Sequence, residues 1–192
     1  MPGRGEDKQD CLSRRAQHHF PDALIVHRLD MATSGLLLMA RSPAMQRLLG
    51  AQFEARTVDK QYVAVVDGCL VTPTDGLNAW QLIDLPIAVD WPRRPLRIID
   101  AAVGKPSKTR WQVIKVNALA CTTRVALAPI TGRSHQLRVH MQAIGHPILG
   151  DSLYAPESIQ RKAERLLLHA QALAFDHPAT KKRLAFSSEP PF

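Results

Sequence analysis

The sequence predicts an α+β domain with a mixed, mostly antiparallel sheet. Residues 110–116 and 122–128 alternate apolar and polar side chains, as two neighbouring half-buried strands do. Other segments begin with helix-capping residues and continue with apolar side chains at helical spacing. The chain has 192 residues, of which 45% are hydrophobic and 22% charged, so we expect one domain, residues 1–192, with a sizeable core.

In the first half of the chain, residues 1–22 are polar and predict a loop with one short helix, and residues 36–40 predict a buried strand. Ser42-Pro43 predicts the start of a helix that runs to about residue 56, because a hydroxyl caps the first turn and proline suits its first position. Residues 61–67 predict a strand. Residues 68–110 predict short extended pieces that prolines interrupt.

In the second half, Ser134 is expected to cap a helix that runs to about Ile144, with Gly145 just after its end. Leu137, Met141 and Ile144 would form its buried stripe. Residues 156 to about 165 predict another helix, and residues 166–175 and 184–186 predict closing strands.

The charge and the cysteine content indicate which kind of partner the protein binds and in which cellular compartment it is expected. The net charge is +8, with basic residues spread over several segments, and this distribution suits a structured RNA. No apolar run approaches the roughly 18–20 residues that span a bilayer, and the charged N-terminus does not resemble a signal peptide. We therefore expect a cytoplasmic protein that does not bind membranes. Its three widely spaced cysteines predict reduced thiols rather than a disulfide framework or a zinc site.

Residues 26–35, VHRLDMATSG, are the segment most indicative of chemistry. If residues 26–30 are extended, Arg28 and Asp30 share one face and Leu29 points into the core. The following Thr-Ser-Gly supplies hydroxyls and a glycine for a tight turn. Taken without further information, an aspartate in such a position is more often an ordinary turn-capping carboxylate beside a surface arginine.

The nine residues HRLDMATSG match the pattern H-R-L-D-x-x-T-S-G, which resembles the signature of the RluA-type pseudouridine synthases, enzymes that isomerise uridine in RNA. The resemblance covers roughly residues 20–192, and residues 84–92 and 129–154 are similar in detail to the dual-specificity tRNA/rRNA members. Further segments match in the same order: Lys60-Gln61-Tyr62, residues 131–140 (TGRSHQLRVH), residues 145–151 (GHPILGD) and residues 165–170 (RLLLHA).

The resemblance implies roles for particular residues. Asp30 would be the essential catalytic carboxylate, Tyr62 would stack on the uracil with its hydroxyl near carbon 5, and Arg133 would pair with Asp30. Arg28 would occupy the space that the flipped base leaves. The RNA-binding candidates are completed by His27, Thr33, Gln136, Arg138 and Leu168.

Several of these residues have an equally good structural interpretation. Tyr62 and Leu168 lie in apolar segments typical of a core, and Gln136, Arg138 and His140 are either phosphate contacts or structural hydrogen-bonding groups. His135 and His140 are five residues apart, which is not the spacing of a helical zinc pair, so we predict no metal. The isomerisation is redox-neutral, so we predict no cofactor.

The chain departs from the family pattern at its start. Family members normally begin with strands that carry a K-P-x-G motif, and Met1-Pro2-Gly3-Arg4 resembles the stretch just after it. We therefore expect those N-terminal strands to be missing. The alternatives to an active synthase are a truncated RNA-binding remnant of the family and a basic hydrolase using histidines, for which no nucleophile motif is present. We expect a monomer with no obligate protein partner, acting on tRNA anticodon stem-loops and 23S rRNA hairpins.

Overall fold

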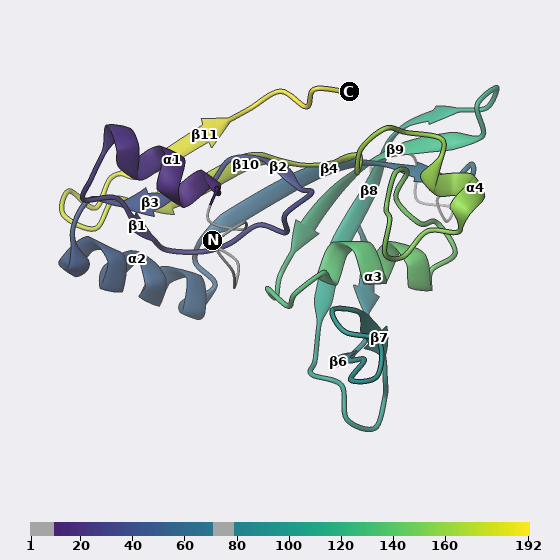
Figure 1. The fold of residues 1–192 in the computed structure, drawn as a ribbon, viewed down its shortest axis with the longest axis horizontal. Coiled ribbons are helices and arrows are strands. Elements are labelled where there is room, and N and C mark those ends of the chain that lie inside the picture. The colour runs from purple at the N-terminus through teal and green to yellow at the C-terminus, as the bar shows by residue number, and fades with distance from the viewer. Residues whose placement is uncertain (1–9, 71–78) are drawn as a thin grey trace.

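The computed structural model describes residues 10–70 and 79–192, and a seven-stranded sheet forms the centre of this part (Figure 1). All but one of the pairings between neighbouring strands are antiparallel, and β2 (Ser34–Gly35) alone pairs in parallel with β10. The predicted mixed, mostly antiparallel sheet is confirmed. Across the sheet the strands follow the order β11 (Arg183–Ser187), β10 (Leu168–Asp176), β4 (Asp59–Asp67), β9 (Thr122–Pro129), β8 (Lys108–Asn117) and β5 (Gln81–Asp84).

Two small antiparallel ribbons accompany the sheet. One pairs β1 (Leu24–Ile25) with β3 (Met39–Ala40), and the other pairs β6 (Ile87–Val89) with β7 (Arg97–Ile99). In Figure 1 the helices α1 (Leu12–His19) and α2 (Pro43–Ala55) lie toward one end of the sheet, near the first ribbon. The helices α3 (Gln136–Ala143) and α4 (Glu157–Gln160) lie toward the other end, and the β6–β7 ribbon projects beyond α3.

Three hydrophobic clusters hold these parts together. The largest lies between the central strands and α3 and contains Leu127, Met141 and Ile148, all fully buried. A second joins α2 to β10 through residues such as Leu49 and Phe175. The third is smaller and packs the β6–β7 ribbon against α3; its buried members are Ile87, Val139 and Tyr154. Both ends of the molecule are therefore firmly packed.

The helix signals in the sequence are partly correct. Ser42 caps α2, since its hydroxyl accepts a hydrogen bond from the Met45 amide at 3.3 Å. Gly145 follows α3 with a φ of 86°, as predicted. Ser134 does not cap α3, because His135 holds the N-cap position with a left-handed φ of 59° and makes no side-chain cap.

Two other predicted elements are shorter in the structure. The strand predicted over residues 36–40 contains only Met39–Ala40, because residues 36–38 belong to no strand. The helix predicted from residue 156 to about 165 is the four-residue α4, Glu157–Gln160. The short N-terminal helix is present as α1.

The cysteines are free thiols, and two that are distant in sequence are close in space. The Sγ atoms of Cys69 and Cys121 lie 3.8 Å apart on the surface. Over residues 10–70 and 79–192, none of the helices is long and apolar enough to cross a membrane.

Candidate active site

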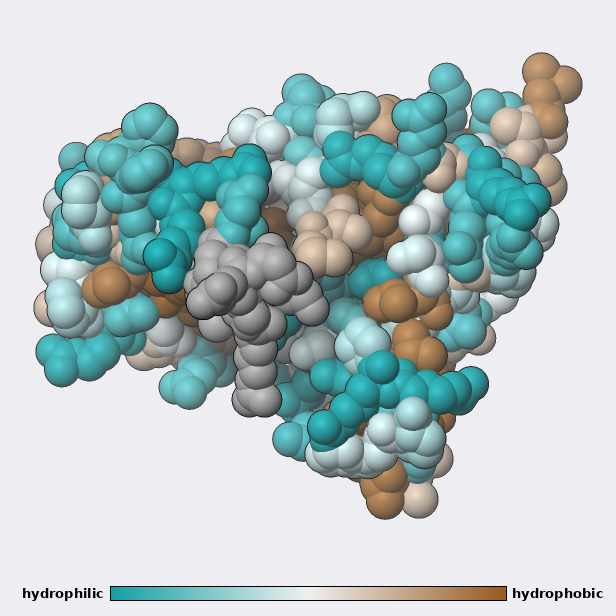
Figure 2. All heavy atoms as spheres, in the orientation of Figure 1, coloured by the Kyte–Doolittle hydropathy of each residue, from teal (hydrophilic) through white to brown (hydrophobic). Residues whose placement is uncertain are grey.

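A cavity of about 790 Å³ opens between the two ends of the molecule. Its walls come from residues 26–33, from α2, from the start of β4, from residues 129–138 and from Leu168 on β10. Figure 2 shows the surface hollowed between the part that bears α1 and α2 and the part that bears α3. The volume is that of a small-molecule or nucleoside-sized site.

Asp30 is held in this cavity by a turn and by the short strand β2, which follows the turn. The Thr33 amide donates a hydrogen bond to the Asp30 carbonyl at 3.0 Å, and β2 then pairs with β10. Gly35 allows this pairing because a Cβ at that position would lie 2.3 Å from the Ala170 carbonyl oxygen. The Asp30 side chain is only 17% exposed.

The segment that leads to Asp30 is not part of a strand, so the condition under which Arg28 and Asp30 would share one strand face is not met. β1 ends at Ile25, and residues 26–30 pair with no strand. Arg28 is exposed while Asp30 is mostly covered, and Leu29 lines the cavity rather than pointing into the core. The segment is a loop that the Asp30–Thr33 turn closes, so the two-residue period of a strand does not apply to it.

The cation beside Asp30 is Arg138 and not Arg133. The Arg138 Nη1 lies 3.6 Å from the Asp30 Oδ2. Arg138 is 4% exposed and is also held by Asp151, through bonds of 2.8 Å and 2.6 Å to the two carboxylate oxygens. Arg138 lies on the buried face of α3 and lines the cavity. The predicted ion pair between Arg133 and Asp30 is therefore wrong in this structure.

Arg133 lies at the rim of the same cavity. It is exposed, and within the described residues it has no carboxylate partner. Its backbone is fixed, since the Arg133 amide donates to the Gln136 Oε1 at 3.0 Å. An exposed guanidinium on a fixed backbone is suited to a phosphate group.

Gln136 is a structural residue rather than an exposed RNA contact. It is 3% exposed, and both ends of its side-chain amide are hydrogen-bonded. Its Oε1 accepts from Thr131 and from the Arg133 amide, and its Nε2 donates to the Lys108 carbonyl and to Thr109. His140, the other candidate on this helix, is fully buried between Thr109 and the Leu85 carbonyl. These contacts favour the structural alternative for Gln136 over a direct RNA contact.

Tyr62 and Leu168 meet in the cavity from two neighbouring strands. In the antiparallel register of β4 and β10, Tyr62 lies opposite Ala170 and Leu168 lies opposite Ala64, so both can face the same side. Leu168 is 2% exposed and belongs to the largest core cluster as well as to the cavity wall. Burial, together with the negative charge of Asp30, raises the pKa of Tyr62 to about 12. The phenol is therefore protonated at neutral pH.

His135 is a neighbour of Asp30 that the sequence did not single out for the site. Its Nε2 lies 3.9 Å from the Asp30 Oδ1, and its Nδ1 lies 2.6 Å from the Tyr154 hydroxyl. The Tyr154 oxygen also accepts a bond from the Arg97 amide, so its own proton is directed at His135. Burial lowers the pKa of His135, which leaves the Nε2–H of a neutral ring facing Asp30.

The remaining predicted RNA-binding residues have different placements. Arg28 is exposed at the cavity mouth, and Thr33 lines it. His27 also lines the cavity, but its Nε2 accepts a bond from the Leu38 amide at 2.9 Å and its ring stacks on Phe53. Burial, aided by the charge of Lys60, lowers the pKa of His27 to about 4. A neutral, hydrogen-bonded imidazole is mainly a structural group.

One wall of the cavity is basic, and the sequence did not reveal it. It comes from α2, the residue that follows α2, and the start of β4. Arg47, Arg56 and Lys60 all line the cavity, and six of its lining residues are arginine or lysine against two acidic ones. Burial, with a contribution from Arg56, lowers the pKa of Lys60. Arg47, Gly50-Ala51 and Glu54 recur at three- and four-residue intervals, and this spacing is the signal that places them on one face of the helix.

Comparison with known proteins gives the family. Residues 2–143 match the model of the RNA pseudouridylate synthase family. The chain belongs to this family. It is 47% identical over all of its 192 residues to the "Dual-specificity RNA pseudouridine synthase RluA" of Escherichia coli K12, covering 84% of that protein. The protein of the same name from Yersinia pestis is 46% identical over 192 residues, and the chain covers 90% of it.

A solved structure shows the same architecture. The human "RNA Pseudouridylate Synthase Domain Containing 1" superposes with a TM-score of 0.80 at 30% identity, over 94% of this chain and 74% of that one. The chain is thus an RNA pseudouridine synthase, an isomerase whose substrate is RNA. The predicted family and reaction class are confirmed.

Proposed function

We propose that Asp30 is the essential carboxylate of this isomerase and that residues 1–192 act as one catalytic domain. The observation that carries the proposal is the placement of Asp30, which lies mostly covered in a nucleoside-sized cavity beside the buried Arg138. In the reaction the bond from the sugar to uracil N1 breaks, a bond to carbon 5 forms, the carbon 5 proton leaves and N1 gains a proton. A carboxylate can start this sequence by covalent attack or by removing a sugar proton.

The neighbours of Asp30 have roles that follow from their contacts. Arg138 fixes the carboxylate and places a positive charge beside it. Tyr62 supplies a flat apolar surface for the uracil, opposite the Leu168 wall. Because the pKa of Tyr62 is about 12, its hydroxyl enters the reaction protonated and accepts the carbon 5 proton only as another group takes its own. Asp30 is the charged group beside it.

The target uridine has to leave its helix or loop to enter this cavity. We propose that exposed Arg28 fills the space that the base leaves and that Arg133 and Arg47 hold the flanking phosphates at the rim. Gln136 and Arg138 would support the site from within rather than contact RNA.

We propose stem-loops of tRNA and of 23S rRNA as the substrates. The support is the extended similarity to relatives whose names call them dual-specificity RNA enzymes, together with the net charge of +8. Single-stranded loop bases are the sites at which proteins read RNA sequence and at which a base is most easily extruded. We place this activity in the cytoplasm, carried out by a monomer without a protein partner or cofactor.

The decisive experiment is tritium release from stem-loop RNA labelled at uridine carbon 5. We expect Asp30→Asn to abolish release while binding fluorescein-labelled RNA as the wild type does. Asp22→Asn is the matched control, since Asp22 is an exposed partner of Arg41 outside the cavity. Undiminished release by Asp30→Asn refutes the catalytic assignment. RNA binding by the wild type without release from any tRNA or 23S rRNA substrate would favour the truncated RNA-binding remnant.

A further inference from the structure

The loop of residues 90–96, which joins β6 to β7, carries an exposed tryptophan outside the active-site cavity. Trp91 is 67% exposed, and the Arg94 guanidinium lies 3.5 Å from the centre of its ring. Because Arg94 covers one face and most of the residue is still exposed, the other face of the indole is open to solvent. An indole with one open face beside a cation is a candidate binding surface.

This loop is firmly held. Asp90 is only 5% exposed, and its carboxylate accepts bonds from the Arg93 backbone amide at 3.2 Å and the Arg93 Nε at 2.7 Å. The Asp90 amide also donates to the Leu96 carbonyl across the loop at 3.1 Å. Below it, Ile87 packs with Val139 of α3. Trp91 is therefore presented from a rigid support rather than from a free tail.

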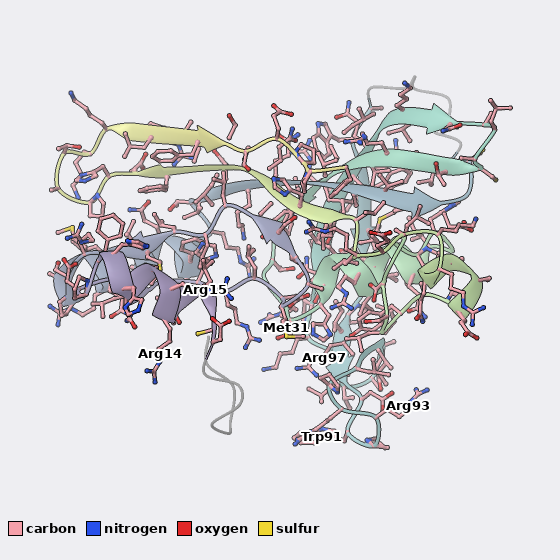
Figure 3. The ribbon with its side chains drawn as sticks, turned by 45° about the horizontal axis from the view of Figure 1, so that its top comes forward. Arg14, Arg15, Met31, Trp91, Arg93 and Arg97 are labelled. Atoms are coloured by element: carbon pink, nitrogen blue, oxygen red, sulfur yellow. The ribbon has the colours of Figure 1, made fainter. Side chains whose placement is uncertain are left out.

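The β6–β7 ribbon is also connected to the active site by hydrogen bonds. The Arg97 amide donates to the Tyr154 hydroxyl at 3.0 Å, and that hydroxyl contacts His135, the neighbour of Asp30. Figure 3 shows Arg97 between Met31, the residue after Asp30, and Trp91 at the far end of the β6–β7 ribbon. RNA whose uridine occupies the cavity would thus continue past Arg97 toward the 90–96 loop.

We propose that the 90–96 loop is a second RNA contact, in which Trp91 stacks on an unpaired base outside the cavity and Arg94 and Arg97 face the backbone. This inference rests on the proposed function, because it requires RNA in the cavity. Aromatic rings are the usual platforms for unpaired bases, and each base has a face that can stack. The contact would position the stem-loop and so help to select it.

The charges of the loop favour RNA over a protein partner. The loop and the first residue of β7 contain three arginines, Arg93, Arg94 and Arg97, and one acidic residue, Asp90. The Asp90 carboxylate already accepts hydrogen bonds from Arg93. Within the described part of the chain Arg94 has no carboxylate partner and interacts only with the indole. Figure 2 shows mainly hydrophilic side chains over this projecting part of the molecule, with hydrophobic ones at its tip. A cation stacked on an aromatic ring is typical of single-stranded nucleic acid sites.

The test measures binding in the Asp30→Asn background, so that catalysis does not consume the substrate. The probe is a fluorescein-labelled RNA with the sequence of an anticodon stem-loop, followed by anisotropy. We expect Trp91→Ala to weaken binding about tenfold, the size of one lost stacked base, and Trp91→Phe to retain most of the affinity. Binding of RNA should quench tryptophan fluorescence, and Trp91→Phe should remove most of that quenching.

Leu119→Ala is the matched control, because Leu119 is a fully exposed apolar residue in the turn between β8 and β9. It should leave affinity unchanged, and a blunt RNA duplex without unpaired bases should bind Trp91→Ala and the parent equally. Unchanged stem-loop affinity in Trp91→Ala overturns the proposal. If sedimentation shows instead that Trp91→Ala only dissolves a self-association, the loop is a protein contact and the proposal is also overturned. Failure of the catalytic proposal is recognised separately, by tritium release from Asp30→Asn.

Discussion

Arg138 and Asp151 form a buried two-point ion pair directly behind the proposed catalytic carboxylate. The Arg138 Nη2 lies 2.6 Å from the Asp151 Oδ1, and Asp151 is fully buried. The same oxygen accepts the backbone amides of Leu153 and Tyr154 at 2.9 and 3.1 Å. Asp151 therefore fixes both the guanidinium that faces Asp30 and the turn that carries Tyr154.

The first prediction concerns Asp151→Asn, which preserves the size of the side chain and removes its charge. Because Arg138 would then be buried with only a longer contact to Asp30, we expect the free energy of unfolding to fall by about 3 kcal/mol. We also expect slower isomerisation, since the guanidinium would no longer be held from behind. Urea unfolding and tritium release measure the two effects. A variant as stable and as active as the wild type would show that Asp151 does not position Arg138.

The second prediction separates Gln136 from Arg133, which lie three residues apart. Gln136→Leu leaves the Arg133 amide and the Thr131 hydroxyl without their acceptor, so we expect a stability loss of about 1–3 kcal/mol. Arg133→Ala should leave stability unchanged, weaken RNA binding and lower the salt dependence of that binding by about one phosphate contact. Urea unfolding and anisotropy over a salt series measure both variants. The opposite pattern, with Gln136→Leu affecting only RNA affinity, would contradict the structural role.

The exchange of roles between Arg133 and Arg138 shows what the sequence does and does not determine. The motif placed both arginines near the site, because their residue types and spacing are visible in the chain. Which guanidinium reaches Asp30 depends on the direction in which α3 leaves its first residue, and His135 sets this direction with a left-handed backbone. A left-handed backbone is uncommon at any residue other than glycine, and although histidine adopts it more often than most, the sequence alone does not predict it at His135. Pairing with Asp151 is likewise a tertiary contact.

In the fold, too, local patterns are visible in the sequence, whereas contacts between distant segments are not. The alternating side chains of residues 110–116 and 122–128 predict β8 and β9, and Ser42-Pro43 predicts the start of α2. The alternation considered for residues 26–30 does not apply, because these residues pair with no strand and line a cavity instead. The parallel pairing of β2 with β10 joins residues more than a hundred positions apart and leaves no mark in either segment.

The third prediction tests this β2–β10 contact. Gly35 has a φ of 107°, and an added Cβ would lie 2.3 Å from the Ala170 carbonyl oxygen. We expect Gly35→Ala to lower the free energy of unfolding by more than about 1 kcal/mol and to reduce isomerisation, because the Asp30 turn would move with β2. Gly50→Ala is the control: no atom lies within 4 Å of the new Cβ in α2, and the substitution should add about 0.5–1 kcal/mol of stability. Equal stability of Gly35→Ala and the wild type would show that β2 can shift without cost.

The fourth prediction concerns the pH dependence of stability through His27. The folded protein holds the pKa of His27 at about 4, against 6.5 for an unperturbed imidazole, because the ring is buried beside Lys60. Between these values the unfolded chain binds a proton that the folded protein does not, so stability should rise with pH from about 4 to 6.5 and level off above. The difference attributable to His27 is up to about 3 kcal/mol. His27→Gln, whose side-chain oxygen can accept the Leu38 amide, should flatten this part of the profile, whereas the contributions of His135 and His140 would remain. Urea unfolding of both proteins across this range measures the change, and identical slopes would show that His27 is as easily protonated in the folded state as in the unfolded one.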